Sequence, residues 1–462
     1  MPTQRRVTSL LALAFVLLCG GCAVASRPDP PPDLGRGHRW IRSHPFTLMA
    51  LVLRPRTYDG REYAACNLNT ALLWKPENAL FEETVRTGLP WHGHAKSRRF
   101  YGNEGRTRFD EIMQSRMRQL VEEYPGCAAW MVWDEPERDE IELAARIARW
   151  TREAFPDTLV YTNANPGGHP EFRGMPPRDG YGYGTYLRDI TGTIQPDVLM
   201  VDIYPFFKQP FGDRIPHYRF NALQVRNAAL EAGIPYWMFV QAYSEAVPGN
   251  NNDRRYPSES DLRMQVFTSL AMGYTGIAYF LFCPGFERTM LDEDGTPGPL
   301  YHHAARLNTE LRHLGRTLRF LRSTDVRFVT GHHDENGRTA SNEEDRFIDA
   351  WDADAGHASG LGDIRITGAG RGRDGLVGLF EDDDGQPYFM LVNLWHGEGA
   401  AASAKETTFE VTLAPGVKKV RRLSRDTGRA ERLRPKNGVL RVTLPGGTGD
   451  LFTTGRGGFP GM

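Results

Sequence analysis

From residue 46 onward, the chain alternates short apolar runs with longer segments that repeat apolar positions at helical spacing. An apolar run of about four to eight residues is typical of a buried strand, and the longer segments are typical of amphipathic helices. The pattern predicts eight strands, at residues 46–53, 70–74, 87–94, 128–133, 158–164, 197–205, 236–243 and 276–282. Strands that alternate with helices form parallel sheets, and eight of them predict a (β/α)8 TIM barrel.

After about residue 325 the pattern changes to alternating apolar and polar positions between Gly- and Asp-rich turns. Period-two alternation in short segments predicts an all-β sandwich of roughly a hundred residues. We therefore expect a barrel domain at 38–325 and a β-sandwich domain at 326–455, the latter with a loop-rich lead-in. Packing support for the barrel is the expected role of the sandwich, and independent carbohydrate binding is the alternative.

The N-terminus carries two arginines, an apolar run at residues 7–18 and small residues before Cys22. This order is typical of a secretory signal, and the run is short for a membrane span. The sequence "LCGGC" resembles a bacterial lipobox with Cys22 as the lipidated residue. We expect residues 1–22 to be a lipoprotein signal peptide and 23–37 a Pro-rich tether. The protein would then be exported to the bacterial cell envelope and touch the membrane only through its lipid; simple cleavage is the alternative.

Composition narrows the choice of partners. A formal net charge of -1 over 462 residues gives no long-range attraction to polyanions, so nucleic acid is not an expected partner. Cys66, Cys127 and Cys283 remain after the signal, each in or beside an apolar run. Their number is odd, and we expect buried free thiols rather than a disulfide or a metal site.

The predicted fourth strand ends in two acids, in "AAWMVWDEPE". In parallel barrels, functional side chains gather at the carboxyl ends of the strands, so Asp134 and Glu135 should face the mouth. Neighbours on an extended chain point to opposite sides, so we expect Glu135 to enter the site and Asp134 to support it. A purely structural alternative is a helix start, with Asp134 as N-cap and Pro136 in the first turn.

Other predicted strands end in polar and aromatic residues. Asp202 and Tyr204 follow strand six at alternate positions, which places both side chains on one side of the chain. Carboxylates, amides and rings together suit a sugar, because pyranose faces stack on rings and hydroxyls take directional hydrogen bonds. The further candidates for substrate contact are Trp91, His92, His94, Asn163, Asn165, Gln241 and Tyr243. The two histidines have no third ligand nearby, so neither a metal nor another cofactor is expected.

Cleavage of a glycosidic bond needs a proton donor and a second group across the anomeric carbon. Glu135 is the expected donor. Asp202 is the first choice for the second group and Glu245 the second choice. Asp134, Tyr204 and Gln241 would orient these groups or the sugar.

Several segments over about residues 45–455 resemble the barrel glycoside hydrolases, including β-galactosidase-like barrels with an appended β-domain. The segments are "CNLNTALLW", "MVWDEPE", "QPDVLMVDIYPF", "SESDLRMQVFTSLAMGYTGIAYFLF" and "MLDEDGTPGPLYHHAARLNTELRHLG". The resemblance implies hydrolysis of O-glycosyl bonds in an oligo- or polysaccharide.

The resemblance also exposes a departure from the family pattern. Glycoside hydrolases of clan A carry Asn-Glu at the end of strand four and a nucleophilic Glu at the end of strand seven. Glu135 matches the acid/base, Asp134 stands where Asn is usual, and Gln241 stands at the nucleophile position. An amide cannot form the glycosyl ester.

Three outcomes stay open at this point. Glu245 or Asp202 could replace the nucleophile. The N-acetyl group of the substrate could attack, as in chitinase-like and hexosaminidase-like enzymes, which use an adjacent acidic pair at strand four. The third outcome is a cell-surface barrel that binds carbohydrate without cleaving it.

Overall fold

The computed structural model describes residues 34–51, 53–95, 109–167, 181–246, 253–331, 347–352, 359–367 and 373–462. The expected signal peptide, Cys22 and the tether up to residue 33 lie outside the described residues. Residues 35–462 belong to one unit. None of the described helices combines the length and the apolar character that crossing a bilayer requires.

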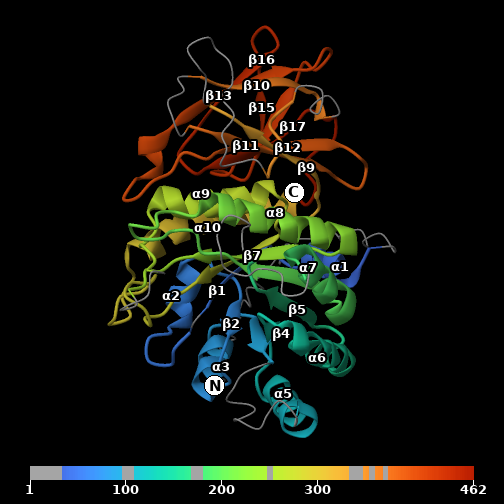
Figure 1. Ribbon diagram of the computed structural model, residues 1–462, viewed down its shortest axis with the longest axis vertical. Helices are drawn as coiled ribbons and strands as arrows, with labels where there is room; N and C mark the ends of the chain where they lie inside the picture. The colour runs from blue at the N-terminus through green and yellow to red at the C-terminus, as the bar shows by residue number, and fades with distance from the viewer. Residues whose placement is uncertain are drawn as a thin grey trace, which may run out of the picture. The chain divides into compact units, whose positions relative to one another are not determined.

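Eight parallel strands form the first part of this unit, in the order β1-β8-β7-β6-β5-β4-β3-β2 (Figure 1). They are β1 (Thr47–Leu51), β2 (Ala71–Leu73), β3 (Trp91–His94), β4 (Cys127–Asp134), β5 (Leu159–Ala164), β6 (Val198–Asp202), β7 (Tyr236–Gln241) and β8 (Gly276–Phe280). Each overlaps its predicted run, so the prediction of a (β/α)8 barrel is confirmed. β3 is shorter than predicted, because Gly88 has a φ of 71° and Pro90 has no N–H to donate to a neighbouring strand.

Asn69 completes the barrel between β1 and β2. Its backbone N–H donates to the Leu48 carbonyl at 2.9 Å, and its side-chain oxygen accepts from the Leu48 N–H at 3.0 Å. Its side-chain nitrogen donates to the Phe46 carbonyl at 2.8 Å. One asparagine thus supplies the hydrogen bonds that a neighbouring strand would supply, and the barrel is nearly closed.

Helices surround the strands. They are α1 (Arg36–Ser43), α2 (Gly60–Ala65), α3 (Asn78–Arg86), α5 (Gln114–Glu123), α6 (Ile141–Ala154), α7 (Tyr183–Asp189), α8 (Ile215–Ala232), α9 (Glu259–Ala271) and α10 (Pro299–Leu318). Short helical turns add η1 (Phe109–Met113), η2 (Arg138–Glu140), η4 (Ile190–Ile194) and η7 (Ala402–Lys405). Local sequence explains several ends: Ser258 and Asp261 form a capping box at the start of α9, and Gly233 ends α8 with a φ of 67°.

Helix α1 covers the amino-terminal end of the barrel. Trp40 and Ile41 pack with the apolar side chains of the barrel interior. A Cβ on Gly37 would lie 1.8 Å from the carbonyl oxygen of Asp197, the residue before β6. The helix begins at Arg36, so the predicted tether does not extend to residue 37. The opposite, carboxyl-terminal end of the barrel remains as the place for a site.

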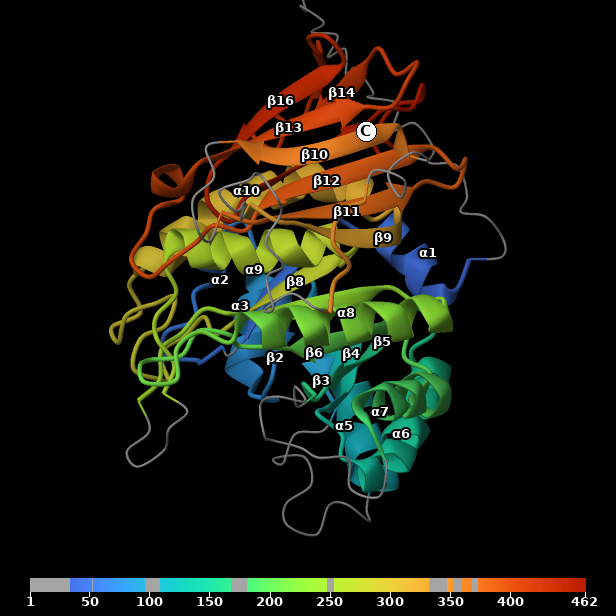
Figure 2. The ribbon, with the colours of Figure 1, turned by 45° about the horizontal axis from the view of Figure 1, so that its top comes forward.

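Antiparallel strands form the second part, with sheet orders β10-β13-β16 and β15-β14-β17-β12-β11-β9 (Figure 2). The strands are β9 (Arg322–Val329), β10 (Leu361–Thr367), β11 (Gly375–Glu381), β12 (Pro387–Asn393), β13 (Thr407–Leu413), β14 (Val420–Leu423), β15 (Ala430–Leu433), β16 (Val439–Leu444) and β17 (Gly449–Thr453). Residues from both sheets share one apolar core. The predicted β-sandwich is therefore confirmed, and its first strand begins at Arg322.

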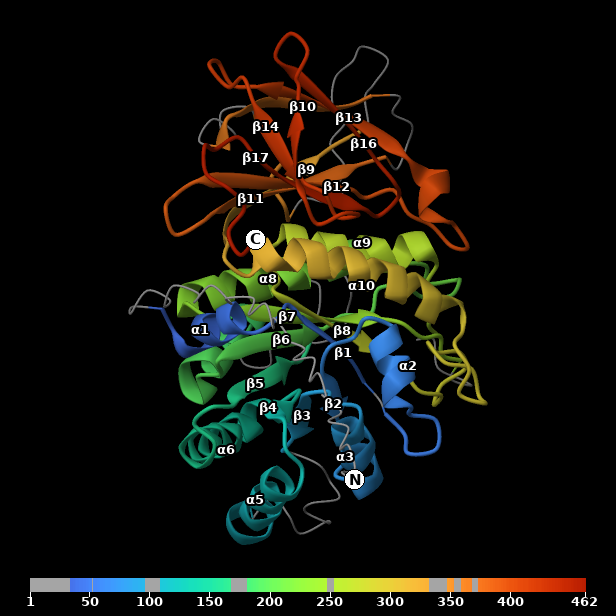
Figure 3. The ribbon, with the colours of Figure 1, turned by 180° about the vertical axis from the view of Figure 1, so that it is seen from behind.

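The six-stranded sheet also packs against α9, which lies between the barrel strands and the β-domain (Figure 3). A Cβ on Gly378 would lie 2.0 Å from the Ala271 carbonyl oxygen, so β11 touches the α9 backbone closely. Leu376 and Phe380 face the barrel helices, whereas Val377 and Leu379 face the sandwich core. Burial on both faces explains the unbroken apolar run "GLVGLF" in place of alternation.

Candidate active site

One asparagine joins two carboxylates at the mouth of the barrel. The side-chain nitrogen of Asn163, in β5, donates to Asp134 Oδ1 at 3.0 Å and to Asp202 Oδ1 at 2.8 Å. Both carboxylate oxygens accept from the same nitrogen, so the distance between them is at most the sum of the two hydrogen-bond lengths, about 5.8 Å. Strands β4, β5 and β6 thus bring two acids to one point.

Glu135 joins this cluster through an unusual backbone conformation. It follows β4 with a φ of 50°, and its N–H donates to the Asn163 carbonyl at 2.8 Å. A left-handed non-glycine residue costs on the order of 1 kcal/mol and tends to occur at functional sites. Alternation, which underlies the expectation that Asp134 and Glu135 point apart, holds only on an extended chain, and Glu135 leaves that conformation. Both of their charges act on Asp202.

The helix-start alternative for "DEPE" is also corrected. The first helical turn after β4 is η2, and its N-cap is Glu137 in a capping box with Glu140. Asp134 is the last residue of β4, and its carboxylate accepts from Asn163. Local helix capping therefore does not explain why Asp134 and Glu135 are acidic.

Asp202 resists ionisation. Burial, followed by the charges of Glu135 and Asp134, holds the pKa of its carboxyl well above the usual value, and the hydrogen bond from Asn163 offsets this only in part. Acids coupled in this way share their protons as a group. We call Asp134, Glu135 and Asp202 the carboxyl cluster. It holds a proton at a pH where an isolated aspartate would have lost it, as a general acid requires.

Aromatic rings line the same end of the barrel. Tyr204 lies half-buried with its ring centre 5.4 Å from both Tyr243 and Phe280. Burial, followed by the charge of Asp202, raises the pKa of the Tyr204 hydroxyl, so this hydroxyl stays neutral. His94 stacks on Trp74 at 3.9 Å, and Trp74 is half-buried. These rings provide flat surfaces for a sugar.

Asn165 holds the backbone around Glu135. Its side-chain nitrogen donates to the Glu135 carbonyl at 3.4 Å, and its N–H donates to the Tyr186 hydroxyl at 3.0 Å. The same hydroxyl donates to the Pro136 carbonyl at 2.9 Å. Asn165 and Tyr186 therefore fix the loop that presents Glu135.

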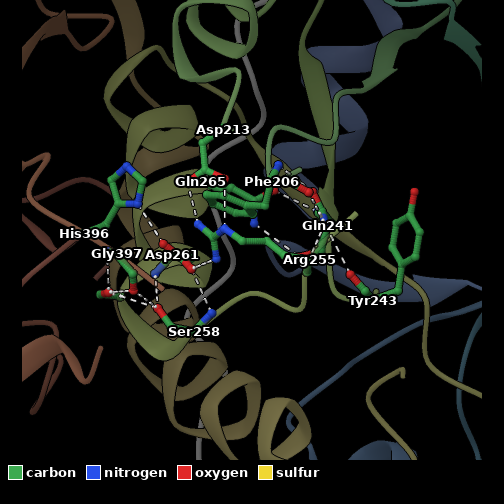
Figure 4. A network of polar contacts seen from close by, with 11 residues as sticks. Phe206, Asp213, Gln241, Tyr243, Arg255, Ser258, Asp261, Gln265, His396 and Gly397 are labelled. Atoms are coloured by element: carbon green, nitrogen blue, oxygen red, sulfur yellow. Dashed lines mark hydrogen bonds and ion pairs between the residues drawn. The ribbon is translucent and has the colours of Figure 1, made fainter. Parts of the chain in front are cut away.

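Gln241 is not a substrate contact, which corrects the sequence-based expectation (Figure 4). Its side chain is fully buried, and Nε2 donates to the carbonyls of Phe206, Tyr243 and Arg255 at 3.0–3.2 Å. Its Oε1 accepts from the Phe206 N–H at 2.9 Å. Every polar atom of the amide is engaged by backbone, so Gln241 ties the loops after β6 and β7 together.

Glu245 also differs from its expected role. Its carboxylate pairs with the Arg254 guanidinium at 3.2 Å, and backbone hydrogen bonds join the same two residues. The charges that act on Asp202 come from Glu135 and Asp134, whereas that of Glu245 acts on Tyr243. Glu245 therefore belongs to the wall of the mouth rather than to the carboxyl cluster.

Trp91 and His92 lie away from the mouth, so their expected contact with substrate is wrong. Trp91 faces the outer helices, where its indole N–H donates to the Tyr124 carbonyl at 3.2 Å. His92 is buried deep in the barrel, stacked on Trp237 and near Trp40 of α1. Burial lowers the pKa of His92 to about 3, so its imidazole is neutral.

Histidines, acids and cysteines are the residue types that bind metal ions in proteins. The described residues contain no group of three or more histidines, cysteines or acids arranged to hold a metal ion. Cys66, Cys127 and Cys283 are free; Cys66 and Cys283 are buried and Cys127 is half-buried. Burial raises the pKa of each thiol.

Sequence reasoning did not name Trp74, Tyr186 or Phe286 as site residues. Trp74 ends the predicted second strand, and the strand-end rule that selected Asp202 would have found it. Tyr186 and Phe286 lie in segments without a periodic pattern. Phe286 is 40% exposed with its ring centre 5.1 Å from Tyr243.

No protein-family model and no curated protein matches the chain. Among solved structures, one described as a glycoside hydrolase is similar, with a TM-score of 0.52 and 11% identity over 88% of this chain and 92% of that chain. An endoxylanase from Clostridium papyrosolvens has a TM-score of 0.41 and 10% identity over 88% and 95%. An endo-β-1,4-mannanase from Thermotoga petrophila has a TM-score of 0.41 and 11% identity over 88% and 98%.

The first of these likenesses extends over the barrel and the β-domain together. At 11% identity it establishes a shared fold. The resemblance to barrel glycoside hydrolases that the sequence motifs indicated is thus confirmed at the level of the fold.

Proposed function

We propose that this protein hydrolyses glycosidic bonds in an oligo- or polysaccharide, with the carboxyl cluster as its catalytic centre. The observation that carries the proposal is the meeting of acids at the ends of β4 and β6, where the Asn163 side chain binds both Asp134 and Asp202 and Glu135 follows Asp134 directly. The nearby charges of Glu135 and Asp134 add to burial in raising the pKa of Asp202. Such a coupled pair keeps one acid protonated and the other charged. Glycoside hydrolysis needs this combination, one carboxyl to donate a proton and one to act across the anomeric carbon.

We assign the delivery of the proton to Glu135, which follows the fourth strand as the acid/base of clan A does. Asp202 is the opposing carboxylate once the shared proton has passed to Glu135. Asp134, held by Asn163, orients the reacting sugar, and the neutral Tyr204 hydroxyl lies beside Asp202. No metal or organic cofactor is required for this chemistry.

A second candidate is substrate-assisted cleavage of an N-acetylhexosamine. Asp134 turns toward the same mouth as Glu135, which favours this route because the adjacent acid would orient the acetamido group. Replacing the acetyl group by trifluoroacetyl weakens that nucleophile. A cleavage rate that falls sharply when acetyl is replaced by trifluoroacetyl would favour the second candidate over a carboxylate nucleophile.

A third candidate is a barrel that binds carbohydrate without cleaving it. The loops after β7 favour it, since the Gln241 amide is hydrogen-bonded to backbone and the Glu245 carboxylate is paired with Arg254.

The N-terminal sequence supports a proposal on location: an exported protein held in the cell envelope by lipid on Cys22.

A glycan panel separates these candidates. Wild-type protein is expected to release reducing ends from at least one glycan class, and Asp202→Asn is expected to bind the same glycan while cleaving it at least about 100-fold more slowly. The amide that this substitution introduces keeps an oxygen that can accept from Asn163, so the fold is preserved. Binding of glycans with no cleavage by the wild type would leave the third candidate and contradict hydrolysis.

A further inference from the structure

Three loops next to the carboxyl cluster form a surface that the proposed chemistry does not use. We call it the arginine ledge. It consists of Phe207, Phe211 and Arg214 after β6, Arg254 after β7 and Phe286 after β8. Phe211 and Phe286 are 45% and 40% exposed, and they are among the few large apolar side chains exposed in the described part of the chain.

Backbone hydrogen bonds hold the ledge in place. The Lys208 N–H donates to the Asp253 carbonyl at 2.9 Å, and the Arg255 N–H donates to the Phe206 carbonyl at 3.2 Å. Arg254 and Glu245 exchange two backbone hydrogen bonds, each 3.0 Å long. A surface fixed before binding loses little entropy when a ligand arrives.

The ledge is continuous with the carboxyl cluster. The Arg254 guanidinium carbon lies 5.8 Å from the ring centre of Tyr204, the tyrosine beside Asp202, and 5.0 Å from that of Phe207. The Arg214 guanidinium lies 4.1 Å from the same Phe207 ring and 6.0 Å from Phe211. A saccharide chain that reaches the cluster can therefore extend along the ledge.

Arg214 carries a positive charge that no acid balances among the described residues. Arg254 is paired with Glu245, and the neighbour of Arg214, Asp213, is bound to Arg255 by two hydrogen bonds of 2.8 and 2.6 Å (Figure 4). Burial and the nearby charge of Arg254 lower the pKa of Arg214. The free protein bears this electrostatic cost, and a bound anion would offset it.

Rings beside a guanidinium suit a sugar that carries a negative group. The rings stack on a pyranose face, and the guanidinium binds a carboxylate or sulfate through two parallel hydrogen bonds. We propose that the arginine ledge binds an anionic unit of the saccharide, a uronate or a sulfate ester, with Arg214 as the residue that pairs with its charge. This inference takes the carbohydrate site of the proposed function as given.

Calorimetric titration tests the ledge without relying on turnover. The full chain with Glu135→Gln is titrated with oligogalacturonate and its carboxyl-reduced counterpart, and with a sulfated galactan oligosaccharide and its desulfated counterpart. One acidic ligand is expected to bind at least about tenfold more tightly than its neutral counterpart, as a charged hydrogen-bonded pair would give. The acidic ligand that shows the preference identifies the anion as carboxylate or sulfate.

Arg214→Met, introduced into the Glu135→Gln protein, should abolish the preference for acidic ligands. Arg214→Lys should keep part of this preference. Arg118→Met is the matched control, because Arg118 lies 5.4 Å over the Trp150 ring on the outer helices, away from the mouth. Equal affinity for acidic and neutral ligands, or an equal loss for both with Arg214→Met, would overturn the proposal. Cleavage of neutral glycans by the wild type, together with equal affinity of Glu135→Gln for acidic and neutral ligands, would overturn the ledge while sparing the proposed hydrolase. An Arg214-dependent acidic preference in a protein that cleaves nothing would support the ledge and contradict the hydrolase.

Discussion

Glu135→Gln is expected to lower kcat by about 10²–10⁴ on glycosides with poor leaving groups, because the departing oxygen then receives no proton. On dinitrophenyl glycosides the loss in the bond-breaking step should be far smaller, since that leaving group departs as an anion. The two losses in bond breaking are compared by measuring kcat/KM for both substrate types. Carboxyl and amide have nearly the same shape, so the substitution removes the acid and little else.

Glu142→Gln is the control for this substitution. Glu142 is exposed in the first turn of α6, on the outside of the barrel, and both of its rates should match the wild type. Equal losses with the two leaving groups in Glu135→Gln would contradict a role as proton donor and point to a nucleophile instead.

Gln241→Glu is expected to destabilise the protein by about 3–5 kcal/mol and to create no nucleophile. The position corresponds to the nucleophile of clan A, so the substitution looks like a restoration. In this fold, however, a carboxylate oxygen would replace Nε2 and face the carbonyl oxygens of Phe206, Tyr243 and Arg255 in a fully buried place. Denaturant unfolding measures the loss, and an assay of glycoside cleavage measures any gain.

Glu245→Gln provides the comparison for stability. Glu245 is partly exposed and paired with Arg254, so its substitution should cost less than about 1 kcal/mol. Unchanged stability of Gln241→Glu together with faster cleavage would show that position 241 reaches the substrate, against the arrangement described here.

The strand pattern predicts the barrel well because parallel strands buried on both faces give unbroken apolar runs. The position of strand ends in such a barrel explains why the acids that follow β4 and β6 could be named from the sequence. Asp134 and Asp202 each end a strand, and strand ends share one rim in a parallel barrel.

The direction and depth of side chains could not be predicted in the same way. Alternation on β3 implies that Trp91 and His92 face opposite sides, but the sequence does not say which faces in. It also does not reveal that α1 brings Trp40 against His92 at the closed end. Such facts depend on packing between distant segments.

The geometry of the acids themselves depends on tertiary contacts as well. The left-handed conformation of Glu135 is held by the Asn163 carbonyl and by the loop that Tyr186 fixes. The engagement of Gln241 depends on carbonyls from three separate positions, Phe206, Tyr243 and Arg255. Strand-end reasoning selects residues of the right type at the right rim, and hydrogen bonding then decides which of them face the substrate.

We expect Asp202 to share a proton with Glu135 and Asp134 at the mouth of the barrel. Titration of ¹³C-labelled aspartate carboxyls by NMR measures this directly, with the Asp202 signal identified by its absence in Asp202→Asn. This carboxyl should titrate well above its usual value of 3.8, and its pKa should fall in Glu135→Gln, where the largest neighbouring charge is gone. Titration near 3.8 that Glu135→Gln leaves unchanged would contradict the shared proton and, with it, the assignment of the cluster.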